Sequence, residues 1–195
     1  MPTQHHSAAG LDPYAERITM GIAMVGGILT LPALFWYLSG MLQYRIAVPG
    51  VVISSAVALA MIVWLTLNYA VQPIEYILED ETLVIRRRWA RRMQVKLKDI
   101  TGASPATALA DVPRMGLRRS FNAGVFGYQG PFELEPYGRV FFAATNRQRL
   151  VALARRNAPP LIISPERPRD FVSAVREALL QRVEQPADET EMVAP

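Results

Sequence analysis

Two long uncharged segments decide the architecture of this chain: residues 18–38, ITMGIAMVGGILTLPALFWYL, and residues 46–69, IAVPGVVISSAVALAMIVWLTLNY. A helix rises about 1.5 Å per residue, so the first segment covers about 31 Å, which matches a hydrocarbon core of about 30 Å. The few small polar residues in these segments are not enough to give either helix a solvated face. The sequence therefore predicts a transmembrane helical hairpin over residues 18–70, rather than two buried helices of a soluble bundle or a cleaved signal peptide.

The positive charges near these segments predict their orientation. Arg17 precedes the first segment and a run of five arginines follows the second, whereas the connecting turn carries only Arg45. Because basic flanks stay in the cytoplasm, we expect both termini on the cytoplasmic side. Residues 1–17 are expected to form a flexible N-terminal tail. Its adjacent histidines, His5 and His6, lack the third ligand that a metal site needs, so no metal is predicted.

Composition limits the chemistry that is open to the chain. Cysteine is absent, which excludes disulfides and thiolate catalysis, and the only two histidines lie in the N-terminal tail, far from any nucleophile. We therefore expect a protein that is not an enzyme and has no cofactor. The net charge of +4 is too small for the broad basic face of a nucleic-acid-binding protein, so no nucleic-acid partner is expected.

After residue 72 the apolar residues alternate with polar ones, which is the pattern of half-buried strands. Strands are predicted at residues 74–79, 83–86, 93–98, 132–135, 139–145, 150–154 and 161–164. Residues 101–131 are predicted to be a long loop with one short element. A helix is predicted over residues 168–183, because Phe171, Val175 and Leu179 form an apolar stripe. Residues 185–195 are expected to be disordered.

Several stretches of this region resemble a known family. They are residues 74–76, 83–86 and 95–100, the run Arg119–Gly130 (RSFNAGVFGYQG) and the ending Ile163–Phe171 (ISPERPRDF). Over about residues 72–184 they are similar to bacterial pleckstrin-homology-like (bacterial PH domain) membrane proteins. The resemblance implies an antiparallel barrel of about seven strands closed by a C-terminal α-helix, without catalytic residues, and a multi-pass protein of the bacterial inner membrane. Members often carry an acid that caps this helix, where this chain has Arg167.

Two sets of residues are candidates for binding. The first is a basic patch that could contact anionic lipid or could only set the topology of the hairpin: Arg86, Arg87, Arg88, Arg91 and Arg92. The second is a glycine-rich and aromatic loop that could contact a partner: Phe121, Gly124, Phe126, Gly127, Tyr128 and Gly130. The loop lacks the Gly-Lys-Ser/Thr ending of a phosphate loop, so its glycines are better explained by a bend or bulge in a strand.

These observations favour a membrane-anchored binding or scaffold module. Its expected partners are the membrane, anionic lipid, and a protein partner or a second copy of the chain. One alternative is an accessory subunit of a membrane transport or envelope-stress complex, whose hairpin would pack through small residues such as Gly21, Gly26 and Gly27. The other alternative is a membrane-bound hydrolase.

Overall fold

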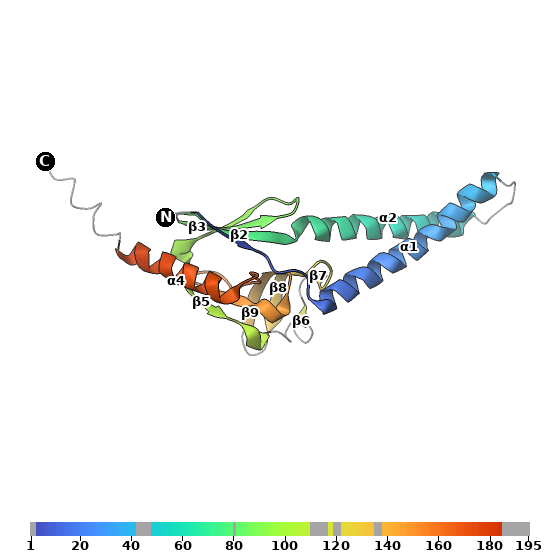
Figure 1. The fold of residues 1–195 in the computed structure, drawn as a ribbon. Helices are drawn as coiled ribbons and strands as arrows, with labels where there is room; N and C mark the ends of the chain where they lie inside the picture. Colours follow the sequence, from blue (N-terminus) through green and yellow to red (C-terminus); the bar gives the residue numbers. More distant parts are fainter. Residues whose placement is uncertain are drawn as a thin grey trace.

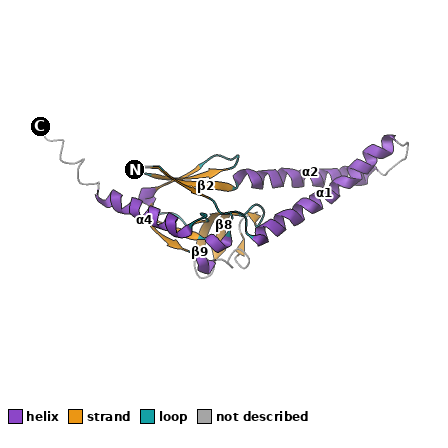
Figure 2. Cartoon of the chain, viewed as in Figure 1, coloured by secondary structure: helices purple, strands orange, loops and turns teal. Residues whose placement is uncertain are grey.

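The computed structural model describes residues 3–41, 48–79, 81–109, 117–118, 122–134 and 138–184. Two long helices, α1 (Pro13–Met41) and α2 (Val48–Val71), project from one end of a β-rich domain (Figure 1). The domain is closed by the helix α4 (Pro168–Glu184), which runs along the side of the sheets (Figure 2). A hairpin of two long helices followed by a β-rich region and a closing helix is what the sequence predicts.

By length and composition, both long helices could cross a membrane, with candidate spans at residues 13–40 and 51–71. Only 6% and 18% of their most apolar windows are buried inside the protein, so neither helix is buried by the β-rich domain that the structure describes. The hydroxyl groups of Thr30, Ser55 and Thr66 donate to carbonyl oxygens of their own helices, which satisfies them without water. A Cβ at Gly26 would lie 3.0 Å from the sulfur of Met61, so this predicted contact residue serves the hairpin itself.

The strands form two sheets. The first has the order β1-β2-β3-β4 and contains β1 (Gln4–Ser7), β2 (Pro73–Glu79), β3 (Thr82–Arg87) and β4 (Met93–Lys96). The short 3-10 helix η1 (Leu97–Asp99) leads into the second sheet, whose order is β5-β10-β11-β9-β8-β6, with β7 beside β8. Its strands are β5 (Ile100–Pro105), β6 (Leu117–Arg118), β7 (Asn122–Ala123), β8 (Tyr128–Leu134), β9 (Gly138–Ala144), β10 (Val151–Arg155) and β11 (Leu161–Ile163).

This arrangement differs in part from the predicted antiparallel barrel of about seven strands. The strands are divided between two sheets, and β9 and β11 pair in parallel, with Phe142 opposite Ile162. A parallel pair needs a crossover between its strands, and β10 supplies that crossover together with the 3-10 helix η3 (Arg147–Arg149).

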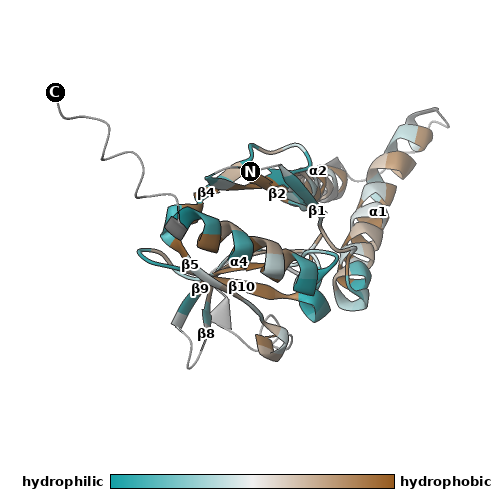
Figure 3. Ribbon diagram, turned by 60° about the vertical axis from the view of Figure 1, so that its left-hand side comes forward, coloured by the Kyte–Doolittle hydropathy of each residue, from teal (hydrophilic) through white to brown (hydrophobic). Residues whose placement is uncertain are grey.

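The second sheet is buried on both faces. Along β9, Phe141 and Ala143 face the core that is shared with the first sheet and α4, whereas Phe142 and Ala144 face a second cluster on the opposite side. Helix α4 closes the first core with Phe171 and Val175, both fully buried, and Figure 3 shows polar and apolar residues alternating along it. The predicted apolar stripe of this helix is therefore confirmed.

The prediction of a flexible tail is wrong for the N-terminal segment. Residues 4–7 pair with β2 as the strand β1, with His6 opposite Tyr76. The segment then joins the two sheets, since Ala8 N–H donates to Ile74 and Ala9 N–H donates to Ser164. These contacts use backbone groups, which any sequence supplies.

The predicted loop over residues 101–131 is also partly wrong. It contains the strand β5, which pairs with β10 along its whole length, and the beginning of β8. The Arg176 guanidinium binds the Ala103 carbonyl at 3.1 and 3.2 Å, which ties α4 to β5. Residues 110–116 and the predicted tail 185–195 lie outside the described residues.

Candidate functional site

Two loops of the domain lie at the bases of the long helices (Figure 1). One is the turn between β3 and β4, residues 88–92, and the other is the loop 124–127 between β7 and β8. Backbone hydrogen bonds fix the first loop to the end of α2, because the N–H groups of Trp89 and Ala90 both donate to the Ala70 carbonyl, at 3.0 and 2.9 Å. We call these two loops together the rim.

Tyr69, in the last turn of α2, connects the two loops of the rim. Its ring makes edge contacts with Trp89 at 5.0 Å and with Phe126 at 5.1 Å between ring centroids. The guanidinium carbon of Arg88 lies 4.4 Å from the centre of the same ring, a cation-π contact. The aromatic and basic side chains of the rim are therefore held together at the end of an apolar helix.

The loop 124–127 has an unusual backbone. Gly124, Phe126 and Gly127 have positive φ angles of 111°, 52° and 118°. A Cβ at Gly127 would lie only 2.6 Å from the Ala144 carbonyl oxygen, so no other residue fits there. The Phe126 N–H donates to the Thr19 hydroxyl at 2.9 Å, which attaches the loop to α1.

Most of the predicted partner-contact loop is therefore occupied within the chain. The Phe126 ring contacts Tyr69 of α2, and its N–H binds Thr19 of α1. Gly124 and Gly127 are buried, and Gly130 lies within β8. Tyr128 is fully buried, and Phe121 lies outside the described residues. The tight packing of this loop against α1 and α2 leaves it little surface for another protein.

A buried carboxylate lies behind this loop. Asp12 is fully buried and caps α1, accepting hydrogen bonds from the N–H groups of Tyr14 and Ala15 at 3.0 and 2.9 Å. It also accepts from the Tyr128 hydroxyl at 3.2 Å and from the Arg147 N–H at 3.0 Å. Burial and the nearby Asp12 raise the pKa of Tyr128, so its hydroxyl stays a donor.

The five predicted arginines are not equivalent. Arg86 binds Glu75 at 3.1 Å, and the side chain of Arg87 is half-buried beside the Met93 sulfur, where burial lowers its pKa. The remaining three, Arg88, Arg91 and Arg92, are exposed in the turn. Alternation along β3 separates the first two arginines, and the turn brings the other three to one end of the domain beside Trp89, which is 69% exposed.

A family model described as "Bacterial PH domain" matches residues 74–179, more than half of the chain. The chain belongs to the bacterial PH domain family. The bacterial PH domain match begins in β2 and ends in α4, so it leaves out β1 and both long helices. Comparison with curated proteins and comparison with solved structures each give no match.

Sequence reasoning found the arginine turn but missed the residues that hold it in the bacterial PH domain. Thr19 lies in an apolar segment and carries no separate signal. Tyr69 marks the end of the second apolar segment, as interfacial aromatics do, but nothing in the sequence shows its contacts with Trp89 and Phe126. Asp12 could have been found, because an aspartate directly before a proline is a typical helix start. Among the described residues, no group of three or more histidine, aspartate or glutamate side chains could hold a metal ion.

Proposed function

We propose that the chain is a membrane-anchored bacterial PH domain whose rim binds anionic lipid headgroups through Arg88, Arg91 and Arg92. One observation supports the proposal above the others: the turn that carries these arginines is hydrogen-bonded to the last turn of α2. If α2 crosses the bilayer, this turn lies at the depth of the headgroups. Trp89 beside them suits the same depth, since tryptophan is enriched at membrane interfaces.

The energy of such binding is modest. Each arginine near an anionic surface contributes about 1 kcal/mol, so the three exposed ones contribute at most about 3 kcal/mol. The interaction is screened by salt, because the Debye length is about 10 Å at 0.1 M and about 3 Å at 1 M. Arg86 and Arg87 contribute less, since one is bound to Glu75 and the other is half-buried.

The proposal places the domain and both termini in the cytoplasm of a bacterial cell, with the hairpin in the inner membrane. A reporter enzyme fused after Pro195 should be active only on the cytoplasmic side, and the same reporter inserted at Gln43 only on the outer side. Reversed signals would contradict the orientation. We further propose a binding or scaffold role rather than catalysis, since the buried polar groups of Asp12, Tyr128 and Thr145 hold the fold together.

The lipid proposal can be tested in the full chain with Trp89 as a reporter. Replacing Trp36 and Trp64 by phenylalanine leaves Trp89 as the only tryptophan. The protein is placed in phosphatidylcholine vesicles that contain a small fraction of brominated lipid, either brominated phosphatidylglycerol or brominated phosphatidylcholine. Bromine quenches nearby tryptophan, so the proposal expects stronger quenching of Trp89 by the anionic lipid.

The preference for the anionic lipid should disappear in the variant Arg88→Gln/Arg91→Gln/Arg92→Gln and at high salt. A matched control is Lys96→Gln/Arg139→Gln/Arg169→Gln, which removes the same charge from exposed positions outside the rim and should keep the preference. Equal quenching of Trp89 by both lipids in the protein that keeps its three arginines would contradict the proposed lipid binding. The arginines would then have only a role in setting the topology of the hairpin.

A further inference from the structure

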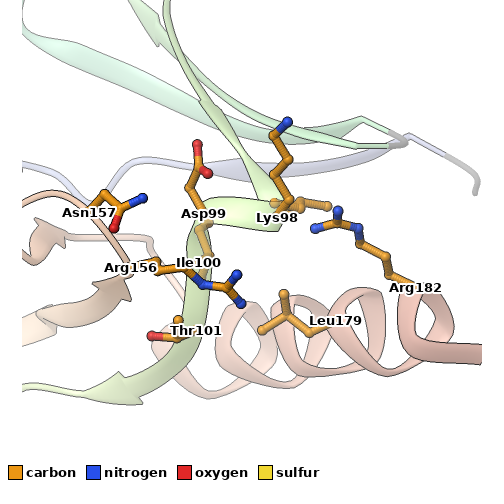
Figure 4. Close-up of a pocket in the computed structure, with 9 residues that line it drawn as sticks. Lys98, Asp99, Ile100, Thr101, Arg156, Asn157, Leu179 and Arg182 are labelled. Carbon is orange, nitrogen blue, oxygen red and sulfur yellow. The ribbon is translucent and has the colours of Figure 1, made fainter. Parts of the chain in front are cut away.

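A second basic surface lies at the end of the domain opposite the long helices. It is a groove of about 790 Å³ between η1, the turn that joins β10 to β11, and the last turns of α4 (Figure 4). The groove is far from the rim because the Leu97 N–H, at the base of the groove, donates to the Glu81 carbonyl in the turn between β2 and β3. That turn and the end of α2 lie at opposite ends of β2. We call this surface the distal groove.

The distal groove has an apolar floor and a basic edge. Leu97 and Ile100 are buried at its base, and Leu179 of α4 lies beside them. Its cations come from three separate elements: Lys98 from η1, Arg156 from the turn after β10, and Arg182 from α4 (Figure 4).

The three cations of the groove have no charged partner in the part of the chain that the structure describes. No carboxylate among those residues lies within ion-pair distance of Lys98, Arg156 or Arg182. The groove has one acidic residue of its own, Asp99, so its lining carries an excess of positive charge. An occupant that complements it would be acidic and partly apolar.

The chain that directly follows α4 has this chemistry. Residues 185–195, QPADETEMVAP, contain three acids, Asp188, Glu189 and Glu191, followed by Met192 and Val193, and they contain no basic residue. Helix α4 ends at Glu184, two residues after the groove-lining Arg182, and the four residues from Glu184 to Asp188 reach at most about 14 Å, so the acids can return to the basic edge of the groove. We propose that residues 185–195 dock into the distal groove of the same chain, with the acids at the basic edge and the apolar pair on the floor.

The absence of cysteine allows a direct test in the full chain. Thr190 lies between two of the acids, and Asn157 lines the groove, so the pair Thr190→Cys/Asn157→Cys should form a disulfide under mild oxidation. The matched control is Thr190→Cys/Ser173→Cys, since Ser173 is exposed on α4 but does not line the groove. If the acidic segment makes three exposed ion pairs with the groove, the disulfide in Thr190→Cys/Asn157→Cys should form about tenfold faster than the disulfide in the control.

Charge reversal tests the cause of the docking. Reversing the charges of the groove with Lys98→Glu/Arg156→Glu/Arg182→Glu should lower the rate of disulfide formation between positions 190 and 157 to that of the control. Adding the opposite reversal in the segment, Asp188→Lys/Glu189→Lys/Glu191→Lys, should restore the rate. Recovery also shows that the reversed groove still folds. A milder variant, Asp188→Asn/Glu189→Gln/Glu191→Gln, changes no residue of the domain and should give the same loss.

Two results would overturn the proposal. In the first, the groove and control pairs form disulfides at equal rates, which means that the acidic segment has no preference for the groove. In the second, two differently tagged chains are mixed and the disulfide joins one chain to the other, which means that the groove receives the segment from a second copy.

Discussion

Replacing Asp12 by alanine tests whether the N-terminal segment is part of the folded domain. The change removes the cap of α1, which costs about 1 kcal/mol. It also leaves the buried Tyr128 hydroxyl without its acceptor, at about 1 to 3 kcal/mol, and the half-buried Arg147 N–H without its acceptor, at about 1 kcal/mol. The free energy of unfolding should therefore fall by about 3 to 5 kcal/mol. For a domain of this size, this lowers the melting temperature by roughly 10 to 20 °C.

The assay is thermal unfolding of the full chain in mild detergent, followed by the fluorescence of Trp89 in the Trp36→Phe/Trp64→Phe background. Glu16→Ala is the matched control, because Glu16 is an exposed acid in the first turn of the same helix, and its loss should cost less than about 1 kcal/mol. Asp12→Asn should give an intermediate value, since one oxygen remains for the cap. If Asp12→Ala and Glu16→Ala melt within a degree or two of each other, the buried carboxylate does not hold α1 to the domain.

Three further predictions concern the loop, the closing helix and the response to pH. Gly127→Ala should destabilise the domain by more than about 2 kcal/mol, because of its positive φ and its contact with β9, whereas Gly102→Ala has open space and should change the melting temperature by only a few degrees. Phe171→Ala should cost about 3 to 5 kcal/mol in chemical denaturation, and a loss below 1 kcal/mol would contradict its place in the core. Burial lowers the pKa of His6 below its usual 6.5, so the stability that neutral His6 gives to the β1 pairing is present above pH 6.5 and is lost as the pH falls through the lowered pKa. Hydrogen exchange of residues 4–9, corrected for intrinsic rates, should therefore become faster as the pH falls through that range. The variant His6→Gln should not show this acceleration.

The two long helices and α4 could be predicted because their signals lie in their side chains. Uncharged length defines α1 and α2, and the apolar stripe of Phe171 and Val175 defines α4. The strands β2 and β3 could also be predicted, since each contains a short apolar run bounded by charged residues. Their predicted alternation is only partial, because residues 76–78 and 83–85 are buried one after another.

The missed strands have no such pattern. In β5 only Ile100 and Ala103 are buried among small residues, and its place is set by pairing with β10 and by Arg176. In β1 the sequence QHHS is polar throughout. The strand is held by backbone hydrogen bonds, by the contact of His5 with Glu75 at 2.8 Å and by the edge of the His6 ring on Phe171. Pairing partners far apart in the sequence decide such strands, and a single sequence does not show them.

The candidate site was predicted in the same uneven way. The arginine run is visible as a cluster of charges, but its division into a bound, a half-buried and three exposed side chains depends on β3 and on Glu75. The sequence predicts that the glycines of the loop bend or bulge a strand, and Gly124 and Gly127 have positive φ angles at the end of β7 and before β8. The loop's true neighbours, Thr19 and Tyr69, lie more than 50 residues away in helices that appear uniform in the sequence.

Each long helix is attached to the domain at its base. Helix α1 is attached through Asp12 and Thr19, and α2 through the Ala70 carbonyl and Tyr69. The domain therefore acts as a spacer that fixes the distance between the helices where they leave it. If the hairpin spans a bilayer as proposed, a change in bilayer thickness would tilt the hairpin as one body or change the angle at its far end. Moving the two helix bases apart would first require hydrogen bonds inside the domain to break. A force that strains the helices would therefore be transmitted to the sheets.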